Sequence, residues 1–285
     1  MRAAGRAVER LVQAALEEDL GAGDVTTAAI VPAGARGRAR VVAKAAGVIA
    51  GLEVAREVYR QSDAEIAFDA RLGDGTAVQP GDLVATAEGS FARLLEAERT
   101  ALNFLQRLSG VATLTRRYVE AVGGTGARIV DTRKTTPGWR SLEKAAVLAG
   151  GGTNHRMGLF DAFLVKENHI AAAGGLAEAL SAVDRANAAG LPVEIEVRSL
   201  EELGAVLDHP HPPDRILLDN LAPPELAEAA RRVRAHLPGI LLEASGNVTL
   251  DTVREIAESG VDWISVGALT HSAPALDLSC LIERT

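Results

Sequence analysis

Residues 131–140, DTRKTTPGWR, place two adjacent cations and two hydroxyls where an apolar run gives way to a turn. Arg133 and Lys134 stand just after the run, and Arg156 and Lys166 follow later breaks in apolar sequence. An arginine fork can hold carboxylates or phosphates in bidentate fashion. One basic residue is usually a solvated surface charge, but four at neighbouring strand ends favour a pocket for a ligand with several anionic groups.

Two acidic residues end other apolar runs. Glu196 lies in VEIEV and Asp219 closes RILLD. The alternation in VEIEV puts Glu194 on the same side of its strand as Glu196, which a mere turn does not require. Carboxylate oxygens can hold Mg²⁺ or bond the hydroxyls of a sugar. Beside the cation cluster they indicate a phosphorylated sugar with its metal, with an ion pair to the same cations as the alternative.

Three stretches are rich in small residues. EASGNVT (243–249) and SVGALTHS (265–272) follow the last two apolar runs, where backbone N–H groups commonly form a phosphate site. AGGGTNHR (149–156) lacks the GK[ST] of a P-loop. Its glycines are better explained as a turn that presents His155 and Arg156.

After residue 126, short apolar runs alternate with helical stretches, which predicts βαβ units and a parallel sheet. Six strands are fewer than the eight of a complete barrel, so we expect an incomplete α/β barrel, with a doubly wound open sheet as the alternative. In both, ligands bind at the carboxyl ends of the strands. The expected strands are 128–131, 161–165, 193–197, 215–219, 240–243 and 262–266.

The earlier part of the chain follows a different pattern. Residues 1–115 mix strand-like and helical segments and predict a separate α+β domain, with two helices near 91–109 and 111–122. The barrel domain is expected over 116–272. The last residues, 273–285, are expected to return to the first domain.

Composition limits what such an anion site can serve. The 285 residues carry a formal net charge of −8, whereas nonspecific nucleic-acid or membrane binding needs a broad basic field. The single Cys280 excludes an internal disulfide framework and fits a reducing compartment. The N-terminal segment is unlike a signal peptide, and no apolar run is long enough to span a bilayer. We expect a cytoplasmic protein that binds neither nucleic acid nor membrane.

Several motifs together resemble the quinolinate phosphoribosyltransferase family, whose members are type II phosphoribosyltransferases. The most specific are the RKTTPG block and the GGGxNHRxGL block, and Trp139 stands where the family often has leucine. The matching blocks run in order over almost the whole chain: EDLGAGDVTT, AAGVIAGL, ERTALNFLQRLSGVAT, DTRKTTPGWRSLEKAAVLAGGGTNHRMGL, LVKENH, EIEV, LLDN, EASGNV and SVGALTHS.

The resemblance implies that residues 1–115 form an N-terminal α+β sandwich domain, and it implies roles for individual residues. Arg133, Arg156 and Lys166 would hold the carboxylates of quinolinate, with His155 nearby. Arg99 would reach the pocket from the neighbouring subunit of a homodimer, with larger assembly left open. A second set of residues would bind phosphoribosyl pyrophosphate, including its 5-phosphate, and the Mg²⁺ ion: Lys134, Glu196, Asp219, Ser245, Gly246, Asn247, Gly267 and His271. Of these, Lys134, Glu196 and Asp219 would be catalytic. Glu196 and Asp219 would hold the metal directly or through water.

The reaction that this resemblance implies is transfer of the phosphoribosyl group to quinolinate with loss of CO₂. It yields nicotinate mononucleotide and pyrophosphate for NAD biosynthesis and needs Mg²⁺ but no organic cofactor. Three alternatives stay open. They are nicotinate phosphoribosyltransferase, a paralogue found with molybdate-transport genes, and a non-catalytic phosphate-binding barrel, which would not need both Glu196 and Asp219.

Overall fold

The computed structural model of the chain describes residues 2–285, with side chains from residue 5 onward. Two units emerge from the contacts between residues. The first comprises residues up to 116 together with 136–151 and 269–285. The second comprises 117–135 and 152–268. No helix within residues 2–285 is long and apolar enough to cross a membrane.

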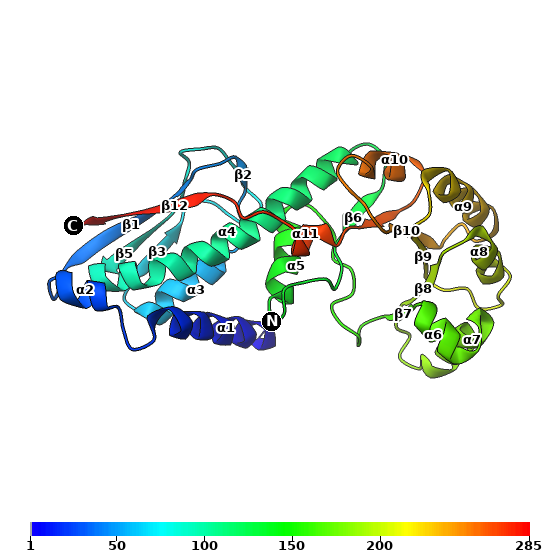
Figure 1. Cartoon of the computed structure of the whole chain (residues 1–285), viewed down its shortest axis with the longest axis horizontal. Helices are drawn as coiled ribbons and strands as arrows, with labels where there is room; N and C mark the ends of the chain where they lie inside the picture. The colour runs from blue at the N-terminus through cyan, green and yellow to red at the C-terminus, as the bar shows by residue number, and fades with distance from the viewer. Residues whose placement is uncertain (1) are drawn as a thin grey trace. The chain divides into compact units, whose positions relative to one another are not determined.

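The first unit is built on a four-stranded antiparallel sheet with helices packed beside it (Figure 1). The strand order is β12-β1-β5-β3, and β2 and β4 pair separately. Its elements are α1 (Arg2–Leu20), α2 (Val25–Ile30), β1 (Arg36–Ala43), β2 (Gly47–Val48), α3 (Leu52–Ser62), β3 (Ala67–Ala70), β4 (Ala77–Val78), β5 (Leu83–Ser90), most of α4 (Phe91–Ala121), α5 (Arg140–Ala149), the end of α11 (Ala268–His271) and β12 (Leu278–Arg284).

Simple alternation explains the central strand of this sheet. In RGRARVVA, Ala39 and Val41 are buried, while the arginines that alternate with them, Arg38 and Arg40, are exposed. Period-2 spacing sends successive side chains to opposite faces, so one face packs on helices and the other meets solvent. The last strand, β12, pairs antiparallel with β1. The C-terminal residues therefore do return to the N-terminal sheet.

The long helix α4 differs from the two helices expected here, because it runs unbroken from Phe91 to Ala121. Gly110 does not end it. A Cβ at this position would collide with the carbonyl oxygen of Pro274, so the glycine permits close backbone approach inside a continuous helix. The prediction of two helices separated at residue 110 was therefore wrong, because Gly110 is needed for close packing against Pro274 and does not end the helix.

The segment 136–151, which we expected in the barrel domain, groups instead with the first unit. Trp139 stacks on Phe104 of α4, with ring centroids 4.6 Å apart. Glu143, fully buried on α5, accepts a hydrogen bond from Arg107 of α4 at 3.1 Å. Helix α5 is thus held to α4 by a stacked aromatic pair and a buried ion pair.

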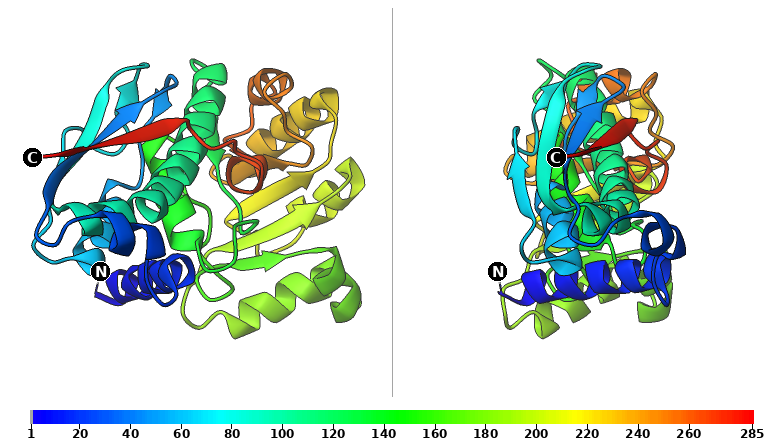
Figure 2. Two further views of the ribbon diagram at one scale, coloured as in Figure 1. Left: turned by 60° about the vertical axis from the view of Figure 1, so that its left-hand side comes forward. Right: turned by 90° about the vertical axis from the view of Figure 1, so that its left-hand side faces the viewer.

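The second unit contains the expected parallel sheet. Its order is β6-β11-β10-β9-β8-β7, with helices along its outer side (Figures 1 and 2). The edge strands β6 and β7 do not pair with each other, which makes this an incomplete α/β barrel, as the sequence predicted. Its elements are β6 (Arg128–Val130), β7 (Phe163–Val165), α6 (Glu167–Ala173), α7 (Leu176–Ala186), β8 (Val193–Val197), α8 (Leu200–Leu207), β9 (Arg215–Asp219), α9 (Pro223–His236), β10 (Leu241–Ser245), α10 (Val253–Glu258) and β11 (Trp263–Ser265).

The two sides of these strands carry different chemistry. Ile195, Ile216 and Leu242 are fully buried on the outer side of the sheet, where the helices lie (Figure 1). The alternate positions point into the barrel, and many of these are polar. They include Glu194, Glu196, Arg215, Asp219, Glu243, Ser245 and Ser265.

Candidate active site

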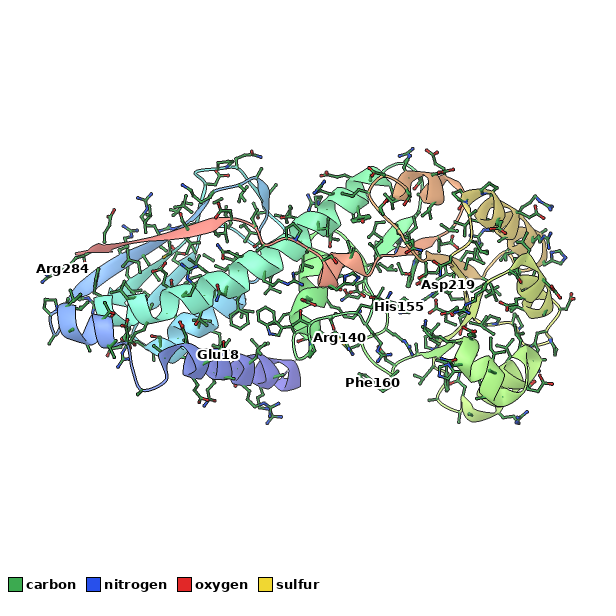
Figure 3. All side chains as sticks on the ribbon, viewed as in Figure 1. Glu18, Arg140, His155, Phe160, Asp219 and Arg284 are labelled. Carbon is green, nitrogen blue, oxygen red and sulfur yellow. The ribbon has the colours of Figure 1, made fainter. Side chains whose placement is uncertain are left out.

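A cavity of about 340 Å³ lies at the carboxyl ends of the barrel strands. Parallel strands end at one edge of the sheet, so the residues that close each strand are brought together there. Most of the predicted site residues line this cavity, and His155 and Asp219 are labelled in Figure 3. The full lining is Asp131, Thr132, Arg133, Lys134, His155, Arg156, Leu164, Lys166, Glu196, Arg198, Leu217, Asp219, Glu243, Ser245 and Ser265.

Five predicted site residues are not among those that line the cavity. Gly246, Asn247 and Gly267 lie in the second unit, next to strand ends that do line it. Arg99 lies on α4 in the first unit with its side chain 59% exposed. His271 also belongs to the first unit, where its Nδ1 lies 2.6 Å from the hydroxyl of Ser272. The roles of these five residues stay predictions.

The loop that presents His155 is aligned with β6 by backbone hydrogen bonds. Thr153 donates to the carbonyl of Ile129 at 2.8 Å, and Asp131 donates to the carbonyl of Thr153 at 3.1 Å. This short parallel bridge continues the sheet for one residue beyond its edge strand. It carries His155 and Arg156 to the side of Asp131 and Arg133, although about two dozen residues separate the two segments.

The cations of the pocket repel one another. Burial and the neighbouring charge of Arg133 both lower the pKa of Arg156 below its ordinary value. Lys134 and Lys166 line the same cavity. Like charges held this close favour a bound ligand that carries more than one negative charge, because each cation then gains an opposite partner.

The pocket acids are paired with cations. Lys166 Nζ lies 2.7 Å from Glu196 Oε2, and Nε of Arg198 lies 3.8 Å from both Glu196 and Asp219. Glu196 therefore forms an ion pair with one of the predicted pocket cations, Lys166, which was the alternative to a metal or sugar site. It does not remove the acids from the cavity, since Glu196 and Asp219 both line it.

A tight turn fixes the end of β9 against the end of β10. Asn220 donates its backbone N–H to Ser245 O at 2.8 Å and its amide to Asp219 Oδ2 at 2.8 Å. Gly246 has a left-handed φ of 101°, and a Cβ there would collide with the Asn220 amide. Only glycine meets both conditions without strain. The turn sets the positions of Asp219 and Ser245 at the cavity.

Deeper in the barrel, His155 is surrounded by carboxylates. Its Nε2 lies 3.0 Å from Glu194 Oε2 and 3.2 Å from Glu243 Oε2. Burial alone would lower the pKa of His155, but hydrogen bonds to Glu194 and Glu243 outweigh it and raise the pKa to about 9. Burial and the charge of Glu194 raise the pKa of Glu243.

Among residues with described side chains, this cluster is the one group of three acid or histidine side chains close enough to hold a metal ion. A guanidinium already sits among them. Arg215 Nη1 lies 3.3 Å from Glu194 Oε2 and 3.2 Å from His155 Nε2. The Cζ atom of Arg215 also lies over the Trp263 ring, 3.8 Å from its centroid. The cluster is therefore a charge-balanced network and not a metal centre.

Sequence reasoning left several of these residues out of the predicted site. Arg198, Glu243 and Ser265 line the cavity, and Arg215 lies behind it, next to Glu194. A signal was available, because Glu243 and Ser245, or Arg215 and Asp219, have the same parity on their strands and so face the barrel interior. The period-2 parity that groups Glu194 with Glu196 thus extends to these residues.

Known proteins resemble the chain over nearly its whole length. The model for the N-terminal domain of quinolinate phosphoribosyl transferase matches residues 24–109, and that for the C-terminal domain matches 111–280. The chain belongs to the quinolinate phosphoribosyltransferase family.

Individual relatives agree with this assignment. The nicotinate-nucleotide pyrophosphorylase [carboxylating] of Mycobacterium leprae (strain TN) is 46% identical over 272 residues, which is 94% of each chain. The probable enzyme of the same name from Synechocystis is 43% identical and covers 97% of this chain and 93% of that protein. The crystal structure of NadC from Streptococcus pyogenes superposes with a TM-score of 0.91 at 39% identity, over 98% of this chain and 97% of that one.

Proposed function

We propose that this protein transfers the phosphoribosyl group of phosphoribosyl pyrophosphate to quinolinate, with release of CO₂ and pyrophosphate, and so forms nicotinate mononucleotide for NAD biosynthesis. The observation that carries the proposal is the crowding of Arg133, Lys134, Arg156 and Lys166 around one cavity. Such a cluster suits a dicarboxylate better than a monocarboxylate. Family membership supports the same reaction.

Quinolinate is assigned to the side of the cavity nearest β6 and β7. Arg133, Arg156 and Lys166 hold its two carboxylates, and the guanidinium forks fix the plane of the pyridine ring. Lys166 now pairs with Glu196 at 2.7 Å. A bound carboxylate would share or take over this lysine, which links occupation of the quinolinate site to the freedom of Glu196.

Phosphoribosyl pyrophosphate is assigned to the side nearest β9 and β10. Lys134 balances its pyrophosphate, and Glu196 and Asp219 face the ribose. For the 5-phosphate we propose the end of β10 and the turns after β10 and β11, which hold Ser245, Gly246, Asn247 and Gly267. The left-handed backbone at Gly246 and Asn247 supports this assignment, because such turns expose N–H groups to an anion. The role of His271, at the end of α11, stays a prediction from the sequence.

The donor set near Asp219 fits Mg²⁺. Magnesium is usually held by one or two carboxylates together with substrate phosphates, and Glu196 and Asp219 supply oxygen atoms on paired strands. Bound there with the pyrophosphate, the ion would neutralise charge on the leaving group. No organic cofactor is required by the proposed chemistry.

The reaction has two steps. The pyridine nitrogen forms a bond to C1 of the ribose while the bond from C1 to the pyrophosphate oxygen breaks. Positive charge develops on the ribose, and the carboxylates of Glu196 and Asp219 can stabilise it. The ring nitrogen is then a pyridinium, so the electron pair left at C2 when CO₂ departs is stabilised by the adjacent positive charge, and the carbanion takes up a proton.

The direct test uses purified protein with quinolinate labelled at the carboxyl next to the ring nitrogen. We expect labelled CO₂ and nicotinate mononucleotide in equal amounts, both dependent on phosphoribosyl pyrophosphate and Mg²⁺. Nucleotide formation without CO₂ would mean a different pyridine substrate. Absence of both products, with intact phosphate binding, would favour the non-catalytic barrel.

A homodimer with shared active sites is part of the proposal, because Arg99 lies in the first unit, outside the cavity-lining residues. Its exposed guanidinium, 59% accessible, leaves it available to a second subunit. In a twofold dimer each subunit would then lend Arg99 to its partner's cavity. The cytoplasmic location stays a prediction from the sequence.

Complementation tests this arrangement. Arg99→Ala and Arg156→Ala homodimers should each lose activity by roughly 30-fold or more, the cost of removing one buried charge partner. After joint unfolding and refolding, each mixed dimer would have one doubly altered site and one intact site. Random pairing should then restore roughly a quarter of wild-type activity. If Arg99 acts within its own subunit, mixing restores nothing.

A further inference from the structure

Four ionisable side chains meet at the wall of the cavity, each from a different segment of the second unit. They are His155, Glu194 on β8, Arg215 on β9 and Glu243 on β10. His155 and Glu243 line the cavity, and the other two lie behind them. Register accounts for part of this meeting, since Glu194 lies directly opposite Arg215 in the paired strands. The side chains are 7%, 3%, 17% and 1% exposed, respectively, so the group lies almost entirely out of water.

The negative and positive charges of these four side chains balance only when all four are present. Two carboxylates face one arginine and one histidine, and Nη1 of Arg215 lies 3.3 Å from Glu194 Oε2 and 3.8 Å from Glu243 Oε2. An isolated buried charge is costly, and removing one member of such a group leaves another unmatched. Trp263 of β11 closes the remaining side, with its ring under the Arg215 guanidinium and edge-on to His155.

The network is connected to the quinolinate side of the cavity through His155. Its backbone N–H donates to Asp131 Oδ1 at 2.8 Å, and its Nδ1 accepts the backbone N–H of Arg156 at 2.7 Å. The histidine ring thus lies between the acids at Nε2 and the main chain of Arg156 at Nδ1. Any rotation of the ring would break contacts on both sides.

The neighbours of the His155 ring favour two different protonation states. The acids favour the doubly protonated ring, whereas the N–H of Arg156 favours an unprotonated Nδ1. In both states Nε2 carries a proton directed at Glu194 and Glu243. The orientation of the ring therefore depends on the acid pair in either case.

We propose that Glu194, Glu243 and Arg215 are positioning residues: the two carboxylates accept the Nε2–H of His155, Arg215 holds the carboxylates, and the ring thereby fixes Arg156 for quinolinate. The role rests on the proposed function, because it assigns the affected ligand. None of the three touches the reacting atoms in this account. Their effect reaches the substrate through His155 and Arg156, and it should leave the phosphoribosyl side of the cavity unchanged.

The test uses Glu194→Gln and Glu243→Gln, which keep side-chain size and remove one negative charge each. Glu255→Gln on the exposed surface of α10 is the matched control. We expect the KM for quinolinate to rise roughly tenfold in each network variant, the effect of weakening one charged hydrogen bond. The kcat, the KM for phosphoribosyl pyrophosphate and all values of the control should stay within about twofold.

A second readout observes the ring itself and does not depend on catalysis. In protein labelled with ¹⁵N-histidine, His155→Gln identifies the signal among the six histidines of the chain. We expect a protonated Nε2 in the wild type and a mixture of tautomers in Glu243→Gln.

Three outcomes would overturn the proposal. They are an unchanged quinolinate KM in both variants, an equal rise in the KM of both substrates, or an unchanged His155 signal. If the wild-type protein released no CO₂ from quinolinate, the proposed function would fail while the ring measurement still decided whether the network holds His155.

Discussion

The antiparallel sheet of the first unit and the parallel sheet of the second differ in the types of residue that they bury. In β1, buried positions are small and apolar and exposed positions are arginine, so the alternation separates core from solvent. In β8, Glu194 and Glu196 are buried, at 3% and 6% exposed, alongside the fully buried Ile195 and Val197. Both sides of a barrel strand are covered, one by helices and one by the barrel interior.

This contrast separates residues that hold the fold from residues that hold a ligand. Burying carboxylates opposes folding unless they are paired, so their presence inside the barrel calls for another explanation. The cavity and the ion pairs around it supply one. In the first sheet, by contrast, exposed charged side chains form ion pairs at the solvent-facing surface, such as Arg38 with Glu88 at 3.0 Å.

The largest effect is expected on the inner side of the barrel strands. Asp219→Asn and Glu196→Gln should each lower kcat by roughly 10²-fold or more, because they remove charge that stabilises the transition state. Quinolinate binding, measured by calorimetry without the second substrate, should stay nearly intact in Asp219→Asn and should not weaken in Glu196→Gln, which removes the acid that competes for Lys166. A variant that instead loses quinolinate affinity and keeps full kcat would show that the acids serve the other ligand.

An outer-side change should act on folding alone. Ile216→Ala, between Arg215 and Leu217 on β9, removes a fully buried side chain and should lower the free energy of unfolding by about 2–5 kcal/mol. Denaturant titration measures this loss, and both KM values should stay within about twofold under conditions where the variant is folded. A selective change in one KM would mean that the outer side also shapes the site.

The smallest effect is expected on the exposed face of the first sheet. Arg38→Gln breaks the ion pair with Glu88, whose partners are 44% and 54% exposed. Exposed pairs contribute about 0–1 kcal/mol, so thermal unfolding should change little and less still in high salt. A loss comparable to that of Ile216→Ala would contradict the proposed division between the two sheets.

The barrel strands could be predicted well because their apolar runs are short and regularly spaced. VEIEV and RILLD coincide with β8 and β9, and the polar residues at the strand ends reach one cavity because parallel strands end at one edge. This part of the site can be predicted from the direction of the strands and the alternation of side chains along them.

The remaining features depend on contacts between distant segments. The continuity of α4 at Gly110 depends on how closely residue 274 approaches, and the grouping of α5 depends on Trp139 and Glu143 meeting α4. The network at the cavity wall needs the register that sets Glu194 opposite Arg215. Periodicity along a single strand contains none of this information.

The central claim is that the cavity is built for two carboxylates. The most direct measurement compares kcat/KM for quinolinate and for nicotinate with the same purified protein, phosphoribosyl pyrophosphate and Mg²⁺. Because buried cations are left unmatched by a ligand with one carboxylate, we expect quinolinate to be preferred by roughly 10²-fold or more. Comparable turnover of nicotinate would contradict the assignment of Arg133, Arg156 and Lys166 to a dicarboxylate.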